Sequence, residues 1–160
     1  MSVQTSTEGA FPPRLLSPER QQDFRKAYNV SEPYKHAVID GLLHDDLLRR
    51  ARQEIVDELR FTEKETDIYK VNQTGDLANL DGLPKEEAQR LEAVLQVRNA
   101  IYSSEFRSWL ERVTGCGPLS AKKKDMSIND YTNGCHLLNH ECVREKRRGD
   151  GHSLIFFSAT

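Results

Sequence analysis

Apolar residues recur every three or four positions in three stretches of the chain, and this spacing predicts amphipathic helices. The clearest repeat, in residues 45–59, places four apolar residues four positions apart: Leu47, Ala51, Ile55 and Leu59. A second helix is predicted to begin at Pro84, and its inward positions are Ala88, Leu91 and Leu95. A third is predicted from about Ser104 to Gly115, with an apolar stripe of Phe106, Trp109, Leu110 and Val113. We interpret these stripes as core positions rather than as cofactor-binding motifs.

A shorter helix is predicted nearer the N-terminus. Ser17 can cap a helix whose first position is Pro18, and this helix would run to about Tyr28 before the Ser-Glu-Pro sequence of residues 31–33 ends it. The segment Tyr34 to Asp40 then contains three consecutive apolar residues, Ala37, Val38 and Ile39, and is predicted to form a short strand.

Strand patterns gather in two later stretches. Residues 66–80 are rich in β-branched residues up to Gly75-Asp76, which predicts a strand followed by a turn. Residues 124–131 alternate, with Met126 and Ile128 on one face. A turn is predicted at residues 132–134, after which residues 135–140 would return as the next strand. Helices first and strands later indicate an α+β fold.

Composition supports one folded domain. The chain has 160 residues, of which 37% are hydrophobic and 30% charged, as in a soluble globular protein. The net charge of -2 gives no direct signal for nucleic-acid binding, and no stretch is apolar enough to predict a membrane span. Residues 1–13, rich in Ser, Thr, Gly and Pro, are predicted to be a mobile tail.

Three cysteines, Cys116, Cys135 and Cys142, are odd in number and lack the CxxC spacing. This pattern argues against both a disulfide framework and a zinc ribbon, so we expect a reducing compartment, in the cytoplasm or the nucleus.

One stretch carries candidate chemistry. Residues 131–140 contain an aromatic residue, Tyr131, a turn glycine, and His140 at the end of a predicted strand. Non-haem Fe(II) oxygenases hold iron with two histidines and one carboxylate on one face. The first two of these ligands commonly form a His-x-Asp sequence, because residues two apart on a strand share a face.

The longer text around this stretch resembles a known family. Residues 68–80 (IYKVNQTGDLANL) and 125–138 (DMSINDYTNGCHLL) are similar to two motif stretches of the ribosomal prolyl 3,4-dihydroxylases, in the same order and with similar spacing. The resemblance covers residues from about Tyr34 to His140. We therefore interpret residues 14–140 as the N-terminal part of a 2-oxoglutarate dioxygenase catalytic domain.

The resemblance implies a fold, cofactors, partners and site residues. It implies N-terminal helices packed on the first strands of an incomplete double-stranded β-helix, a jelly-roll or cupin-like fold. The implied activity is Fe(II)-, 2-oxoglutarate- and ascorbate-dependent hydroxylation of a proline in a small-subunit ribosomal protein, with links to translation termination. His140 matches an iron ligand of the family, and Tyr131 matches a residue that contacts 2-oxoglutarate.

The sequence departs from the family after His140. The family continues with His-Asp-Asp, whereas this chain continues with Glu141 and Cys142, so a cysteine stands at the position of the expected aspartate. The distal iron histidine and a basic residue for 2-oxoglutarate are expected beyond Thr160. We therefore expect an incomplete active site and no activity in the chain as given. We interpret residues 141–160 as an atypical, non-native tail.

Two other interpretations stay open. His136, His140 and Cys142 would share one face of a strand and form a zinc site, with His152 or Cys135 as the only fourth ligands in view. Alternatively, the helical half is a binding module without catalytic turnover. The sequence does not identify the target proline, the number of hydroxyl groups added or the oligomeric state.

Overall fold

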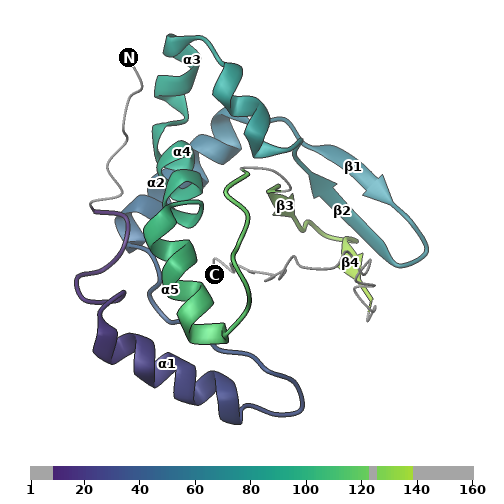
Figure 1. Ribbon diagram of the computed structural model, residues 1–160. Helices are drawn as coiled ribbons and strands as arrows, with labels where there is room; N and C mark the ends of the chain where they lie inside the picture. The colour runs from purple at the N-terminus through teal and green to yellow at the C-terminus, as the bar shows by residue number, and fades with distance from the viewer. Residues whose placement is uncertain (1–8, 123–125, 139–160) are drawn as a thin grey trace.

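A computed structural model of the protein describes residues 9–122 and 126–138. Figure 1 shows the helices gathered in one group, with a small sheet extending from it. The helices are α1 (Pro18–Val30), α2 (Asp45–Glu58), the 3-10 helix η1 (Leu77–Gly82), α3 (Lys85–Arg90), α4 (Glu92–Ile101) and α5 (Ser104–Thr114). The strands are β1 (Thr62–Glu65), β2 (Tyr69–Gln73), β3 (Asn129–Asp130) and β4 (His136–Leu137). The predicted α+β class is confirmed, and these strands form one small antiparallel sheet, so the described residues show no double-stranded β-helix.

The first half of the core lies between α2 and α4. Leu47 and Ala51 of α2 pack with Ala93, Val94 and Leu91 of the α4 region. The carboxylate of Glu54 joins the same helices, since its two oxygens accept hydrogen bonds from the Ala93 and Val94 N–H groups at 3.0 and 2.9 Å. These N–H groups lie in the first turn of α4, where no helical carbonyl is available to them.

The second half of the core lies between α1 and α5 and is mostly aromatic. Trp109 is fully buried, stacks on Phe106 at 5.8 Å between ring centroids, and meets Phe24 edge-on at 5.6 Å. Helix α1 begins as predicted: Pro18 is its first residue, and the hydroxyl of the preceding Ser17 accepts a hydrogen bond from the Arg20 N–H. No helix among the described residues is both long and apolar enough to cross a bilayer.

The start of the described chain corrects one boundary. Residues 9–13 were expected to belong to the mobile tail, but Ala10 is fully buried and its carbonyl accepts a hydrogen bond from the His44 N–H at 3.1 Å. Phe11 stacks on Phe106 at 5.3 Å and contacts both halves of the core. The packed part of the chain therefore begins before residue 14.

Two further predictions are corrected by the structure. The strand expected at Tyr34–Asp40 is absent: the segment has a bend at Tyr34, a turn at Asp40 and no ladder, and Val38 is 73% exposed while Ile39 contacts the core. Burial alternates only over residues 36–40, and among the described residues no strand pairs with this segment. The helix expected from Pro84 is divided into α3 and α4 at Leu91, which leaves helical geometry at φ -118° and ψ 27°.

Arg98 connects the helical group to the sheet. Its guanidinium is buried in α4, donates to the Leu77 carbonyl at 2.7 Å, and forms an ion pair with Asp81. Both partners belong to η1, the segment that follows β2. Arg98 therefore fixes the end of β2 relative to the helices.

Thr74 holds the other side of this junction. Its N–H donates to the Ile128 carbonyl and its hydroxyl accepts from the Ile128 N–H, both at 3.0 Å. These bonds place residues 126–128 beside the end of β2, so the chain enters β3 in a fixed position.

Candidate functional site

Strands β3 and β4 pair with the same neighbour, β2, and both run antiparallel to it. Asp130 lies opposite Asn72, and His136 lies opposite Lys70. Residues 131–135 therefore stand opposite a single β2 residue, Val71, and leave the ladder. We call residues 131–135 the excursion. Such interruptions of a ladder bend a strand and redirect side chains, and they are frequent beside active sites.

The turn predicted at residues 132–134 is present, but it does not form a hairpin. The Cys135 N–H donates to the Thr132 carbonyl at 2.9 Å, and Gly134 has a φ of +92°, which is accessible to glycine at little cost. A strand within residues 135–140 is present as β4, but the expected reversal is wrong, because β4 continues along β2 in the direction of β3. The turn opens and closes an excursion rather than reversing the chain.

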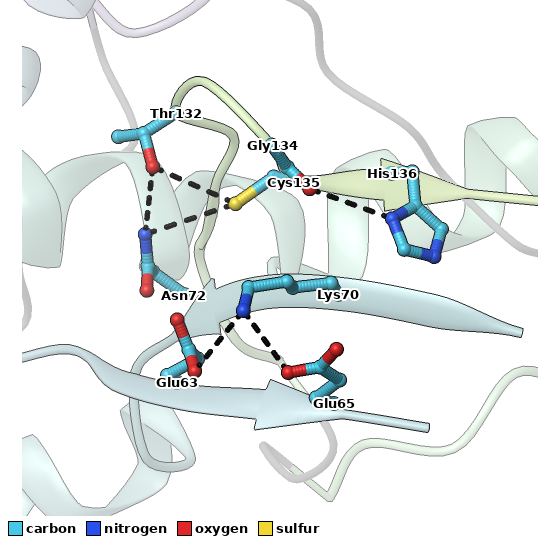
Figure 2. Close-up of polar contacts among 8 residues, drawn as sticks. All are labelled: Glu63, Glu65, Lys70, Asn72, Thr132, Gly134, Cys135 and His136. Atoms are coloured by element: carbon cyan, nitrogen blue, oxygen red, sulfur yellow. Dashed lines mark hydrogen bonds and ion pairs between the residues drawn. The ribbon is translucent and has the colours of Figure 1, made fainter. Parts of the chain in front are cut away.

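The side chain of Asn72, on β2, contacts two residues of the excursion. Its side-chain amide donates to the Thr132 hydroxyl at 3.3 Å and lies 4.0 Å from the Cys135 sulfur. The Thr132 hydroxyl and the Cys135 sulfur are themselves 3.6 Å apart, so the three polar groups form a closed triangle, as Figure 2 shows. Asn72 is thus one of the residues that join the two motif stretches in space, together with Gln73 and Thr74.

Tyr131 is the first residue of the excursion. Half of its surface (50%) is open to solvent. This exposure does not test whether Tyr131 contacts a co-substrate, so that role stays a prediction.

Lys70 lies two residues before Asn72 and on the same face of β2. Its ammonium group is 3.0 Å from the Glu65 carboxylate and 3.4 Å from that of Glu63, both on β1 (Figure 2). The hydrogen bond to Glu65, and to a smaller extent that to Glu63, raises the pKa of Lys70 above its usual 10.5. Because a raised lysine pKa favours the folded state while the amine is protonated, this contribution is lost only as the pH rises through the raised pKa. Lys70 is therefore a cation already paired at neutral pH.

The metal-site predictions concern residues at and after β4. His136 is exposed, and Figure 2 shows its imidazole turned away from the Cys135 sulfur. Among residues 9–122 and 126–138, no group of three or more His, Cys, Asp or Glu side chains is arranged to hold a metal ion. His140 and Cys142 lie outside the described residues, and so do Glu141 and His152. The iron and zinc predictions that depend on them stay predictions.

Sequence reasoning did not single out Asn72 or Thr132 as site residues. The available signal was indirect: both belong to the two stretches that carry the family resemblance, and the structure joins these stretches although Asn72 and Thr132 are 60 positions apart. Two motif stretches of one family, distant along the chain, predict a shared site more strongly than either predicts alone.

Comparison with known proteins gives partial matches. The chain is 36% identical to "Prolyl 3,4-dihydroxylase OGFOD1" of Ostreococcus tauri over 141 residues, which cover 86% of this chain and 27% of the relative. It is 30% identical to "Prolyl 3-hydroxylase OGFOD1" of Mus musculus over 118 residues, covering 73% of this chain and 19% of the relative. It is 27% identical to "Prolyl 3-hydroxylase sudestada1" of Drosophila melanogaster, also over 118 residues, covering 74% of this chain and 20% of the relative. No protein-family profile matches the chain.

These matches cover most of this chain and a part of each relative. Most of the chain aligns, yet the chain spans only about a fifth to a quarter of the length of the curated relatives it matches. The resemblance inferred from residues 68–80 and 125–138 is confirmed at this level. The chain is homologous to a part of the prolyl 3,4-dihydroxylase and prolyl 3-hydroxylase proteins.

Proposed function

We propose that this chain forms the 2-oxoglutarate-binding side of an Fe(II)- and 2-oxoglutarate-dependent prolyl hydroxylase. Homology to proteins named prolyl 3,4-dihydroxylase and prolyl 3-hydroxylase supports the reaction class. The observation that carries the proposal is the excursion: it presents a half-exposed Tyr131 at a point where the two motif stretches meet. The sheet of β1 to β4 is, in this proposal, the beginning of a double-stranded β-helix.

The substrate and setting follow from the same resemblance. We propose that the substrate is a proline in a small-subunit ribosomal protein, that ascorbate supports turnover, and that translation-termination factors are partners. The proposed location is the nucleus and the cytoplasm. The rival proposal is a binding module without turnover that uses the same helices, and binding of 2-oxoglutarate separates the two.

The donor groups fit the proposed cofactors in part. The Tyr131 phenol can donate a hydrogen bond to a carboxylate of 2-oxoglutarate and so orient it. The His140 imidazole suits iron, and Fe(II) with 2-oxoglutarate, when bound, would supply the oxidising chemistry. Cys142 does not fit, because a soft thiolate stands where a carboxylate oxygen is expected.

Binding of 2-oxoglutarate tests the proposal directly. In a calorimetric titration with Mn(II) in place of Fe(II), the chain should bind 2-oxoglutarate, and Tyr131→Phe should weaken binding about ten-fold because one hydrogen bond to a charged group is lost. Tyr34→Phe is the matched control, since Tyr34 is also exposed and lies outside the sheet. If the wild-type chain gave no heat with 2-oxoglutarate, or if both variants behaved alike, the proposal would be wrong.

Catalytic turnover is not expected, because Cys142 stands where the family has a carboxylate ligand for iron. With Fe(II), 2-oxoglutarate, ascorbate and a proline-containing peptide of a small-subunit ribosomal protein, we expect no peptide-dependent succinate release. Cys142→Asp should tighten Mn(II) binding and weaken Zn(II) binding, because an oxygen ligand replaces sulfur. Succinate release that His140→Ala abolished, and that the exposed-residue control His36→Ala left intact, would contradict this expectation.

The zinc alternative makes the opposite prediction for metal preference. If His136, His140 and Cys142 form a zinc site, Zn(II) should bind far more tightly than Mn(II), and His136→Ala should weaken it. In the hydroxylase proposal His136 is not a ligand, so this substitution should leave Mn(II) and 2-oxoglutarate binding unchanged.

A further inference from the structure

We infer that Asn72 is the positioning residue of this site, which fixes the conformation of the excursion and through it the direction of the Tyr131 phenol. The inference rests on the proposed function for the role of Tyr131, but its structural part stands on contacts in the described residues. Asn72 itself is not expected to touch the co-substrate.

The excursion needs a restraint beyond its two ends. The strands on either side contribute only two paired residues each, Asn129–Asp130 and His136–Leu137, and five residues lie between them. A loop closed by such short ladders can adopt many conformations, and each added internal bond removes some of them. Asn72 supplies side-chain contacts from the sheet to Thr132 and Cys135 within the excursion.

Asn72 suits this role because of its amide. The NH₂ group carries two donor hydrogens, and the groups that face it, the Thr132 hydroxyl and the Cys135 sulfur, can both accept. One side chain therefore reaches both ends of the turn that Gly134 and the Cys135–Thr132 backbone bond close. Thr132 is the residue next to Tyr131, so a fixed Thr132 limits where the phenol can point.

The neighbouring polar residues of β2 have other partners. The Gln73 amide donates to the Asn129 and Ser127 side chains at 2.8 and 3.1 Å, so it anchors the approach to β3. Lys70 is directed to the glutamates of β1. Within the described part of the protein, Asn72 is thus the polar β2 residue whose side chain contacts the excursion.

Thiol labelling of Cys135 tests the restraint without any activity assay. Asn72→Leu keeps a similar size and removes the donors, so alkylation of Cys135 by iodoacetamide should quicken about five-fold, the equivalent of one lost hydrogen bond of ordinary strength. Cys116, also half-buried but far along the chain, is the internal reference and should keep its rate. Asn79→Leu, a change of the same kind at an exposed position in η1, is the control variant.

Thr132→Val removes the acceptor from the other side of the contact. Thr132 is exposed, so this substitution should disturb folding little and can replace Asn72→Leu if that variant is unstable. It should quicken the labelling of Cys135 in the same way. An unchanged Cys135 rate in these variants, or an equal rise at Cys116, would refute the restraint.

A double-mutant cycle tests whether Asn72 acts through Tyr131. In the Mn(II) titration, Asn72→Leu should weaken 2-oxoglutarate binding several-fold in the wild-type background and have little effect when Tyr131 is already phenylalanine. Equal effects in the two backgrounds would refute the positioning role. If the wild-type chain bound no 2-oxoglutarate, the proposed function and the positioning role would both fail, while the labelling result would still decide whether Asn72 fixes the excursion.

Discussion

Replacing Trp109 with alanine should lower the free energy of unfolding by about 3 to 5 kcal/mol, the usual cost of removing a buried aromatic residue. The indole is fully buried between α1 and α5 and contacts the rings of both Phe24 and Phe106. Its loss leaves a cavity that these rings cannot fill without leaving their own contacts. Urea unfolding followed by circular dichroism measures the change.

Trp109→Phe distinguishes packing from hydrogen bonding. The indole N–H has no hydrogen-bond partner among the described residues, so a phenylalanine loses volume but no hydrogen bond. It should therefore recover more than half of the stability lost in the alanine variant. Tyr34→Ala, at a residue that is 70% exposed, should change stability little. Similar losses in all three variants would show that the aromatic cluster is not the main source of stability.

Replacing Arg98 with methionine should lower the free energy of unfolding by about 2 kcal/mol, because a charge-assisted hydrogen bond is lost and a carbonyl is left without its donor. The guanidinium is 3% exposed and holds the Leu77 carbonyl at 2.7 Å. Its ion-pair partner Asp81 is 56% exposed, so that carboxylate can be hydrated in the variant. This limits the cost to less than that of a stranded buried charge.

The loss should be local as well as global. Hydrogen exchange in η1 should increase in Arg98→Met, because Arg98 joins this segment to α4. Arg90→Met, which removes the exposed pair with Glu58, is the control and should cost no more than about 1 kcal/mol. Equal effects of the two substitutions would contradict the account of Arg98 as the connection between the helices and the sheet.

Helix ends were predicted well where a side chain or a glycine acts locally. Ser17 and Pro18 start α1, and Gly115, with a φ of +71°, ends α5. The break at Leu91 was not predicted, because neither proline nor glycine marks it. The polar atoms that stabilise the start of α4 come from Glu54, in a different helix, and a local pattern does not reveal such a partner.

The sheet was predicted less well, since strands depend on distant partners. Strand β1, with sequence TEKE, has no apolar alternation, and it forms because β2 lies beside it. The segment Tyr34–Asp40 has three consecutive apolar residues, but no strand pairs with it among the described residues, so it forms no ladder. The turn at residues 132–134 was predicted, but the excursion around it was not. The excursion depends on the register in which β3 and β4 both pair with β2, and the local sequence does not reveal that register.

The most direct test of the account asks whether Tyr131 lies beside bound metal and 2-oxoglutarate. The chain contains five tyrosines, so labelling with 3-fluorotyrosine gives five fluorine resonances, and Tyr131→Phe and Tyr34→Phe identify the two that the test compares. With 2-oxoglutarate present, substoichiometric Mn(II) should broaden the Tyr131 resonance more than the other four, because paramagnetic relaxation falls with the inverse sixth power of the distance from the metal. A Tyr131 resonance that stayed sharp, or that broadened no more than that of Tyr34, would contradict the assignment of this excursion as the co-substrate site.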